Sequence, residues 1–203
     1  MVDNFNEKAD FIWSIADLLR GDYKQSEYQK VVLPLTVLRR LDCVTARNKD
    51  EVLERYEQLQ KQGIENVAPS LKKAADAEVY NTSEYTFETL CNDPDNIAEN
   101  LQYYINQYDE ETKEIFEKFD FGYQIQRLDD ADLLYKVVRQ FGEIDLHPDE
   151  VANEEMGYIY EELIRKFNEL SNETAGEHFT PREVIELMVN LIFQEDDKAL
   201  SER

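Results

Sequence analysis

The sequence is poor in cysteine, histidine, glycine and proline, and several functional motifs are missing from it. Its 2 cysteines, Cys43 and Cys91, lie far apart without a CxxC companion, which argues against a disulfide framework and a zinc site. The 2 histidines, His147 and His178, lie on different segments outside any HExxH pattern, so we expect no metal centre. P-loop, GxGxxG and GxSxG motifs are also missing, so we expect no complete active site and no catalytic residue in this chain.

Long apolar runs are missing as well. No stretch of the sequence is long and apolar enough to cross a bilayer, and residues 1–5 lack the basic and apolar regions of a signal peptide. Two unpaired cysteines fit a reducing compartment. We therefore expect a cytoplasmic protein without membrane contact.

Positive charge is scarce, because 22 Lys and Arg face 45 Asp and Glu and give a formal net charge of -23. A protein that binds DNA unaided needs basic side chains to displace counterions from phosphates, so the composition argues against tight DNA binding by this chain alone. The 12 Tyr and 10 Phe nevertheless indicate a folded protein rather than an acidic disordered tail. The acidic surface fits a basic partner or serves solubility, of which solubility is the more frequent explanation.

The apolar residues recur mostly at intervals of three and four, which is the period of an α-helix. We expect a mainly α fold with about seven to nine helices. Within it, Pro34 is predicted to kink or interrupt a helix, Gly122 to form a turn, and Arg39 and Arg40 to lie on a solvated face. The expected helices cover residues 4–19, 26–47, 50–62, 70–79, 94–108, 110–119, 130–142, 154–170 and 180–192.

One domain boundary is expected, at the polar loop of residues 171–175. Residues 1–170 are predicted to form a helical N-terminal domain, and residues 171–203 a linker and the start of a second domain. The strongest local signal follows this loop, where Thr180 and Glu183 have the spacing of a capping box and Pro181 stands at the first helical position.

Two helices flank this loop in a dense and ordered pattern. The first reads EEMGYIYEELIRKF from Glu154, and the second begins GEHFTPREVIELM from Gly176. The run resembles the methylation (modification) subunits of type I restriction-modification systems, which carry (D/E)xLGxxYExLIxKF, a loop and GxxxTPxxVxxLM at the entry to an N6-adenine methyltransferase domain of Rossmann-like fold. Residues 11–41 resemble the helical start of the same family, so the resemblance covers essentially the whole chain.

The resemblance implies a cofactor-contacting segment at the second helix start. There, free backbone N-H groups and a hydroxyl can meet the polar end of S-adenosylmethionine. Without the preceding helix, residues 180–183 would indicate only a well-made helix start, and the longer context reverses that reading. The implied cofactor-binding residues are Glu177, His178, Phe179, Thr180, Pro181 and Arg182.

The resemblance also implies the activity and the partners of the full-length protein. It would be a site-specific adenine DNA methyltransferase that works with a specificity subunit, a second modification subunit and a restriction subunit on double-stranded DNA. The Gly-rich loop and the (N/D)PP(F/Y) motif that holds a flipped adenine do not occur in these residues, so we expect a truncated, inactive fragment that supplies subunit and DNA-clamp contacts. The alternative is an acidic interaction protein or DNA mimic for a basic partner, which has no reason to carry the GxxxTP segment.

Overall fold

The computed structural model describes residues 2–171, 180 and 182–193 of the chain. These residues form eleven α-helices and three short 3-10 helices, and no strand occurs among them. The predicted mainly α fold is confirmed, with more helices than the expected number of about seven to nine.

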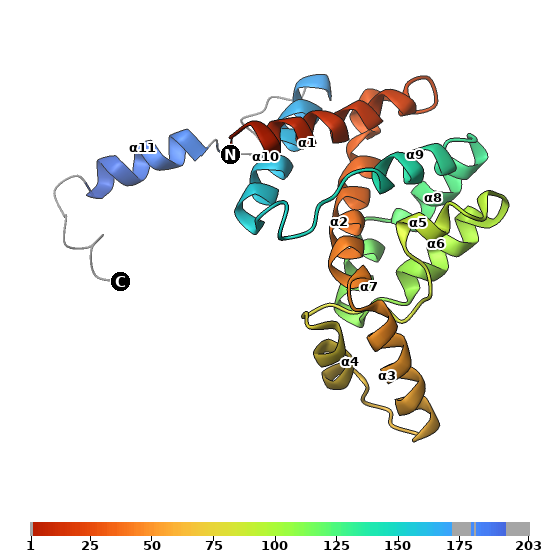
Figure 1. Ribbon diagram of the computed structural model, residues 1–203. Coiled ribbons are helices and arrows are strands. Elements are labelled where there is room, and N and C mark those ends of the chain that lie inside the picture. Colours follow the sequence, from red (N-terminus) through yellow and green to blue (C-terminus); the bar gives the residue numbers. More distant parts are fainter. Residues whose placement is uncertain (1, 172–179, 181, 194–203) are drawn as a thin grey trace.

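Eight helices form the body of the molecule, with α2 running through its middle and α1 and α10 packed together at one end (Figure 1). α5, α6, α8 and α9 lie on the other side of α2 (Figure 1). The three 3-10 helices are η1 (Ala16–Leu19), η2 (Gln25–Glu27) and η3 (Pro94–Asn96). The body helices are α1 (Val2–Ile15), α2 (Gln29–Ala46), α5 (Phe87–Leu90), α6 (Ile97–Asn106), α7 (Glu110–Lys118), α8 (Phe121–Asp130), α9 (Leu134–Gly142) and α10 (Asn153–Ser171).

A single hydrophobic core joins these body helices. Residues far apart in the sequence meet in it, and the predicted apolar faces supply most of its members. Examples that are fully buried are Ile12, Leu35, Leu101, Val138 and Leu163. α2 continues through Pro34, which is itself buried, so this proline does not interrupt the helix.

α3 (Lys49–Lys61) and α4 (Ala68–Ala75) form an arm that projects from the body (Figure 1). The two helices pack against each other around a small second core, separate from that of the body. The buried members of this core are Val52, Leu59, Leu71, Ala75 and Tyr80. The arm is therefore stabilised by its own core, and its orientation is set where α3 begins, at Lys49.

The predicted turn at Gly122 is wrong. Gly122 lies inside α8, and the chain reverses at Asp120, whose φ of 50° is in the left-handed region. Aspartate tolerates this region better than most residues because its short side chain can hydrogen-bond locally. Gly122 serves close packing instead, since a Cβ atom there would lie 3.2 Å from the side-chain oxygen of Gln102 on α6.

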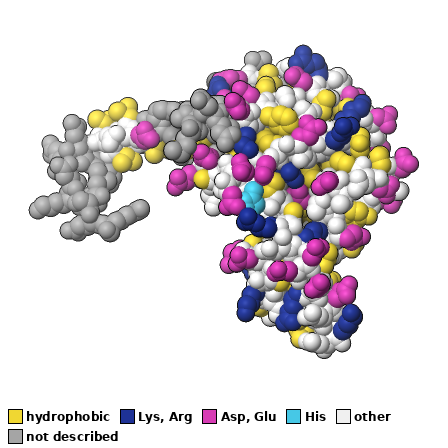
Figure 2. Space-filling view, in the orientation of Figure 1, with side chains coloured by type: hydrophobic (Ala, Val, Ile, Leu, Met, Phe, Trp, Pro, Cys, Tyr) yellow, Lys and Arg dark blue, Asp and Glu magenta, His cyan; other side chains and the backbone are white. Residues whose placement is uncertain are grey.

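α11 (Arg182–Phe193) follows the body and lies apart from it (Figure 1). Among the described helices, none is both long and apolar enough to span a membrane. On the face seen in Figure 2, Lys and Arg side chains are scattered among more numerous acidic ones and do not gather into one basic patch.

Candidate functional site

The predicted cofactor segment lies largely outside the described residues. This is the case for Glu177, His178, Phe179 and Pro181. Thr180 is described and exposed, and Arg182 is the first residue of α11, with a side chain that is not described. The assignment of these six residues to the cofactor stays a prediction.

The helix that follows this segment has an uncovered apolar surface. Its large apolar side chains are between 39% and 69% exposed. Large exposed apolar patches are uncommon on soluble monomers, so this face is a candidate for packing against further protein. The residues are Val184, Ile185, Leu187, Met188, Val189, Leu191 and Ile192.

Arg39 of α2 binds the end of α9 and does not face solvent as predicted. Its guanidinium donates to the backbone oxygens of Ile144 at 2.8 Å and Gly142 at 3.1 Å, and to Asp42 Oδ2 at 2.5 Å. The prediction failed because the carbonyl acceptors come from a segment about a hundred positions later in the chain.

Arg40 is the second correction to the predicted solvated face. Its guanidinium donates to the backbone oxygen of Val151 at 2.7 Å, to Asn153 Oδ1 at 2.7 Å, and also to the backbone oxygen of Leu146. Together, the two arginines hold the connection between α9 and α10. They thereby position α10, the helix that leads toward the predicted cofactor segment.

Asp42 is the centre of a buried polar network between α2, α5 and α6. Its Oδ1 accepts hydrogen bonds from the Tyr104 hydroxyl at 2.8 Å and from the backbone N-H of Phe87 at 3.2 Å, while Arg39 pairs with Oδ2. Burial raises the pKa of Asp42, an effect that Arg39 and these hydrogen bonds oppose. Burial also raises the pKa of Tyr104 well above its usual range. These hydrogen bonds satisfy buried polar groups, so we interpret the network as one that stabilises the fold.

Lys49 links the arm to this network. Its Nζ lies 5.3 Å from the centre of the Tyr104 ring and 3.4 Å from Asn81 Oδ1, and the residue is buried. Burial lowers the pKa of Lys49 to about 8, although Asp42 and Glu84 oppose the shift. Burial therefore disfavours the charged form of Lys49 at the start of α3.

This lowered pKa predicts a pH dependence. Between about pH 8 and pH 10 the unfolded chain binds more protons at Lys49 than the folded chain does, so raising the pH favours folding. Relative to the Lys49→Met variant, the natural protein should gain about 2 kcal/mol of unfolding free energy over this range. Urea unfolding at a series of pH values measures the difference, and a constant difference would contradict the assigned pKa.

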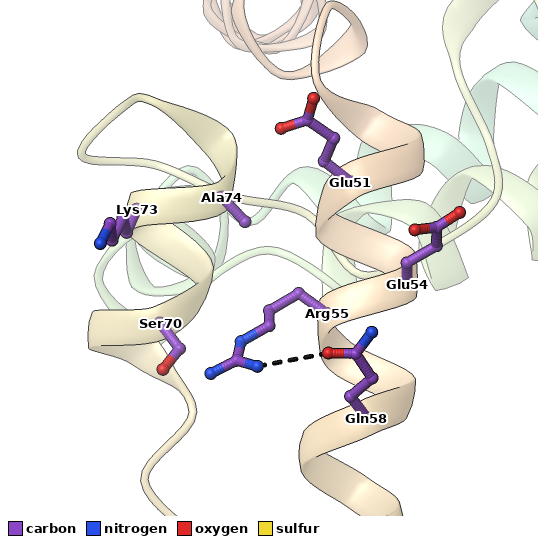
Figure 3. A pocket seen from close by; sticks show the side chains of 7 residues that line it. All are labelled: Glu51, Glu54, Arg55, Gln58, Ser70, Lys73 and Ala74. Carbon is purple, nitrogen blue, oxygen red and sulfur yellow. Dashed lines mark hydrogen bonds between the residues drawn. The ribbon is translucent and has the colours of Figure 1, made fainter.

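A surface pocket between α3 and α4 lacks the residues that would activate a nucleophilic side chain (Figure 3). Arg55 extends from α3 toward α4 and donates to Gln58 Oε1 at 3.3 Å, while Lys73 points away from α3 (Figure 3). Ser70 lines the pocket, but no histidine does. Across the part of the chain that the structure describes, no three His, Cys, Asp or Glu side chains are grouped to hold a metal ion.

The described features are thus a projecting arm, a buried polar network and a helix with an exposed apolar face, all within a mainly α-helical structure. Residues 8–141 match the HsdM N-terminal domain family, and residues 151–202 match the N-6 DNA Methylase family. The chain belongs to the HsdM N-terminal domain family. The two matches are separated by the connection that Arg39 and Arg40 hold, and α10 lies within the second match. The domain boundary expected at residues 171–175 stays a prediction.

A relative supports this assignment. The chain is 26% identical to the type I restriction enzyme MjaIX methylase subunit of Methanocaldococcus jannaschii, over 94% of this chain. The chain spans 36% of the length of that relative. The resemblance to type I methylase subunits is therefore confirmed, and the alternative of an acidic DNA mimic is not favoured.

Proposed function

We propose that this chain is the N-terminal part of a modification subunit that methylates adenine N6 in DNA with S-adenosylmethionine. The observation that carries the proposal is the order of the two family matches, a helical HsdM domain followed directly by the start of an N-6 DNA methylase. The helical body would serve subunit and DNA-clamp contacts, in the cytoplasm, and the chemistry would belong to the methylase domain.

We assign the cofactor contact to residues 177–182, immediately before and at the start of α11. The support is their position at the start of a helix, where backbone N-H groups are free to bind polar atoms, within the methylase match. The exposed face of α11 would pack against the remainder of the methylase domain, which would supply the other walls of the cofactor pocket. Residues 1–203 alone are then expected to be inactive.

The partners in this proposal are a specificity subunit, a second modification subunit and a restriction subunit. DNA would be held by the assembly, because a chain with a net charge of -23 repels phosphate. The specificity subunit would select the DNA sequence, and the helical domains of two modification subunits would close around the duplex.

A methyl transfer assay tests the proposed function. Labelled S-adenosylmethionine and adenine-containing duplex DNA are incubated with residues 1–203 alone, or with the same chain extended by its downstream coding sequence and mixed with a specificity subunit. We expect labelled N6-methyladenine only with the extended protein. Turnover by residues 1–203 would contradict the proposed inactivity, and a downstream sequence without a Gly-rich loop and an NPPF-like motif would contradict the proposed function.

A further inference from the structure

Tyr103 presents an aromatic ring to solvent beside an open groove between α6 and α8. The residue is 44% exposed, and its ring contacts Tyr85 in a T-shaped arrangement with a centroid distance of 6.1 Å. The groove has a volume of about 440 Å³ and is lined by Gln102 and Asn106 of α6 and by Gln126 of α8. This is an amide-lined groove with an exposed tyrosine in its wall, on a chain that is otherwise strongly acidic.

Two carboxylates accompany this ring. Glu99 lies one helical turn before Tyr103 on α6 and lines the same groove. Glu84 directly precedes Tyr85, whose ring contacts that of Tyr103. Partial burial and, to a smaller extent, the negative charge of Glu84 raise the pKa of Tyr103. Both carboxylates are exposed, and neither lies within ion-pair distance of a cation among the described residues, although the charge of Glu84 also acts on Lys49.

Elsewhere in the chain, an aromatic ring and a nearby carboxylate are both contacted by the same Lys or Arg side chain. In three of its four described cation-ring contacts, the cation lies 3.8 to 5.6 Å from the ring centre and also pairs with a carboxylate at 2.5 to 3.0 Å. At Tyr103, no cation of the described residues lies over the ring. The three complete examples are Arg127 with Tyr23 and Glu27, Lys166 with Trp13 and Asp10, and Arg39 with Phe87 and Asp42.

We propose that Tyr103, with Glu84 and Glu99, receives an arginine side chain from a basic segment of a protein partner. The charge of the site is complementary to a cation and repels nucleic-acid phosphate, which favours a protein as the occupant. A tyrosine face attracts a guanidinium, and tyrosine and arginine are both frequent at the energetic centres of protein interfaces.

The groove amides favour arginine over lysine. The side-chain N-H groups of Gln102 and Gln126 already donate within the chain, to Asn106 Oδ1 at 3.4 Å and Asp130 Oδ1 at 2.9 Å. Their carbonyl oxygens accept no hydrogen bond from the described residues and match the several N-H donors of a guanidinium. The partner segment thus places its arginine over Tyr103, with the guanidinium N-H groups directed at the side-chain amide oxygens of Gln102 and Gln126.

NMR titration of the ¹⁵N-labelled chain tests the proposal with two peptides of equal charge, acetyl-Gly-Arg-Gly-Arg-Gly-amide and its lysine counterpart. We expect the backbone signals of residues 99–106 and 122–126 to shift, and the arginine peptide to bind about threefold more tightly than the lysine peptide. Equal affinity of the two peptides, or shifts spread over the whole acidic surface, would show only general charge attraction and overturn the proposal.

Variants separate the ring from the surrounding charge. Tyr103→Leu should weaken arginine-peptide binding about fivefold, whereas Tyr103→Phe, which keeps the ring, should bind like the natural chain. Tyr123→Leu is the matched control, because Tyr123 is a 60% exposed tyrosine of α8 outside the groove lining and should leave binding unchanged. Equal binding by Tyr103→Leu and the natural chain contradicts the proposal, with Tyr103→Phe confirming that the fold is intact.

Discussion

Replacement of Arg39 by methionine is expected to lower the free energy of unfolding by about 3 kcal/mol, because it leaves a buried carboxylate without its cation. Asp42 is only 2% exposed, and the methionine also leaves the backbone oxygens of Gly142 and Ile144 without their donors. Urea unfolding followed by circular dichroism measures the effect.

A second substitution identifies the cause of this loss. Asp42→Asn in the Arg39→Met background removes the unpaired charge and should recover at least about 1 kcal/mol. The matched control is Arg20→Met, since Arg20 and Asp17 also form a pair three positions apart, but with side chains that are 74% and 66% exposed. That control should change the stability by less than about 1 kcal/mol. Equal losses for Arg39→Met and Arg20→Met would contradict the assigned role of burial.

Phe167→Ala should destabilise the chain by about 3 to 4 kcal/mol by opening a cavity between α10 and α1. Phe167 is 2% exposed, and its ring lies 5.1 Å from that of Trp13. Because Trp13 is the only tryptophan of the chain, its fluorescence reports unfolding at this contact directly. Phe167→Leu keeps most of the side-chain volume and should cost about 1.5 kcal/mol or less.

Leu191→Ala is the control for the apolar side chains of the next helix. Leu191 is 63% exposed on α11, so its truncation should change the stability of this chain by no more than about 0.5 kcal/mol. A loss as large as that of Phe167→Ala would mean that α11 packs on the body in solution. The two results together distinguish α10, which packs in the core, from α11, whose apolar side chains are exposed.

The helical character of the chain was predictable from local patterns. The residues of α10 that recur at three and four residue spacing, such as Ile159, Leu163 and Phe167, are the ones that the structure buries. The turn at Asp120 was not predictable in this way, because glycine is the usual residue for a left-handed position and Gly122 stood two residues away. The close approach of Gln102 that explains Gly122 exists only in the folded chain.

Contacts between distant segments account for the other failures. Arg39 and Arg40 lie off the predicted apolar stripe of their helix, but most of their partners are backbone oxygens of a distant segment, which carry no sequence signal. The groove beside Tyr103 likewise depends on α6 and α8 meeting side by side. The assignment of residues 177–182 to the cofactor stays a prediction that rests on the family resemblance, because no local physical pattern distinguishes this segment from an ordinary helix start.

The packing of α1 against α10 has a consequence for synthesis of the protein. α1 leaves the ribosome before α10, the helix with which it packs most extensively, so part of its apolar face stays uncovered while the intervening helices are translated. Closure of the body is thus a late, long-range event, which slows folding compared with pairing of neighbouring helices. Nascent chains arrested before α10 has emerged would expose α1 to chaperones, and release of α10 would end that exposure.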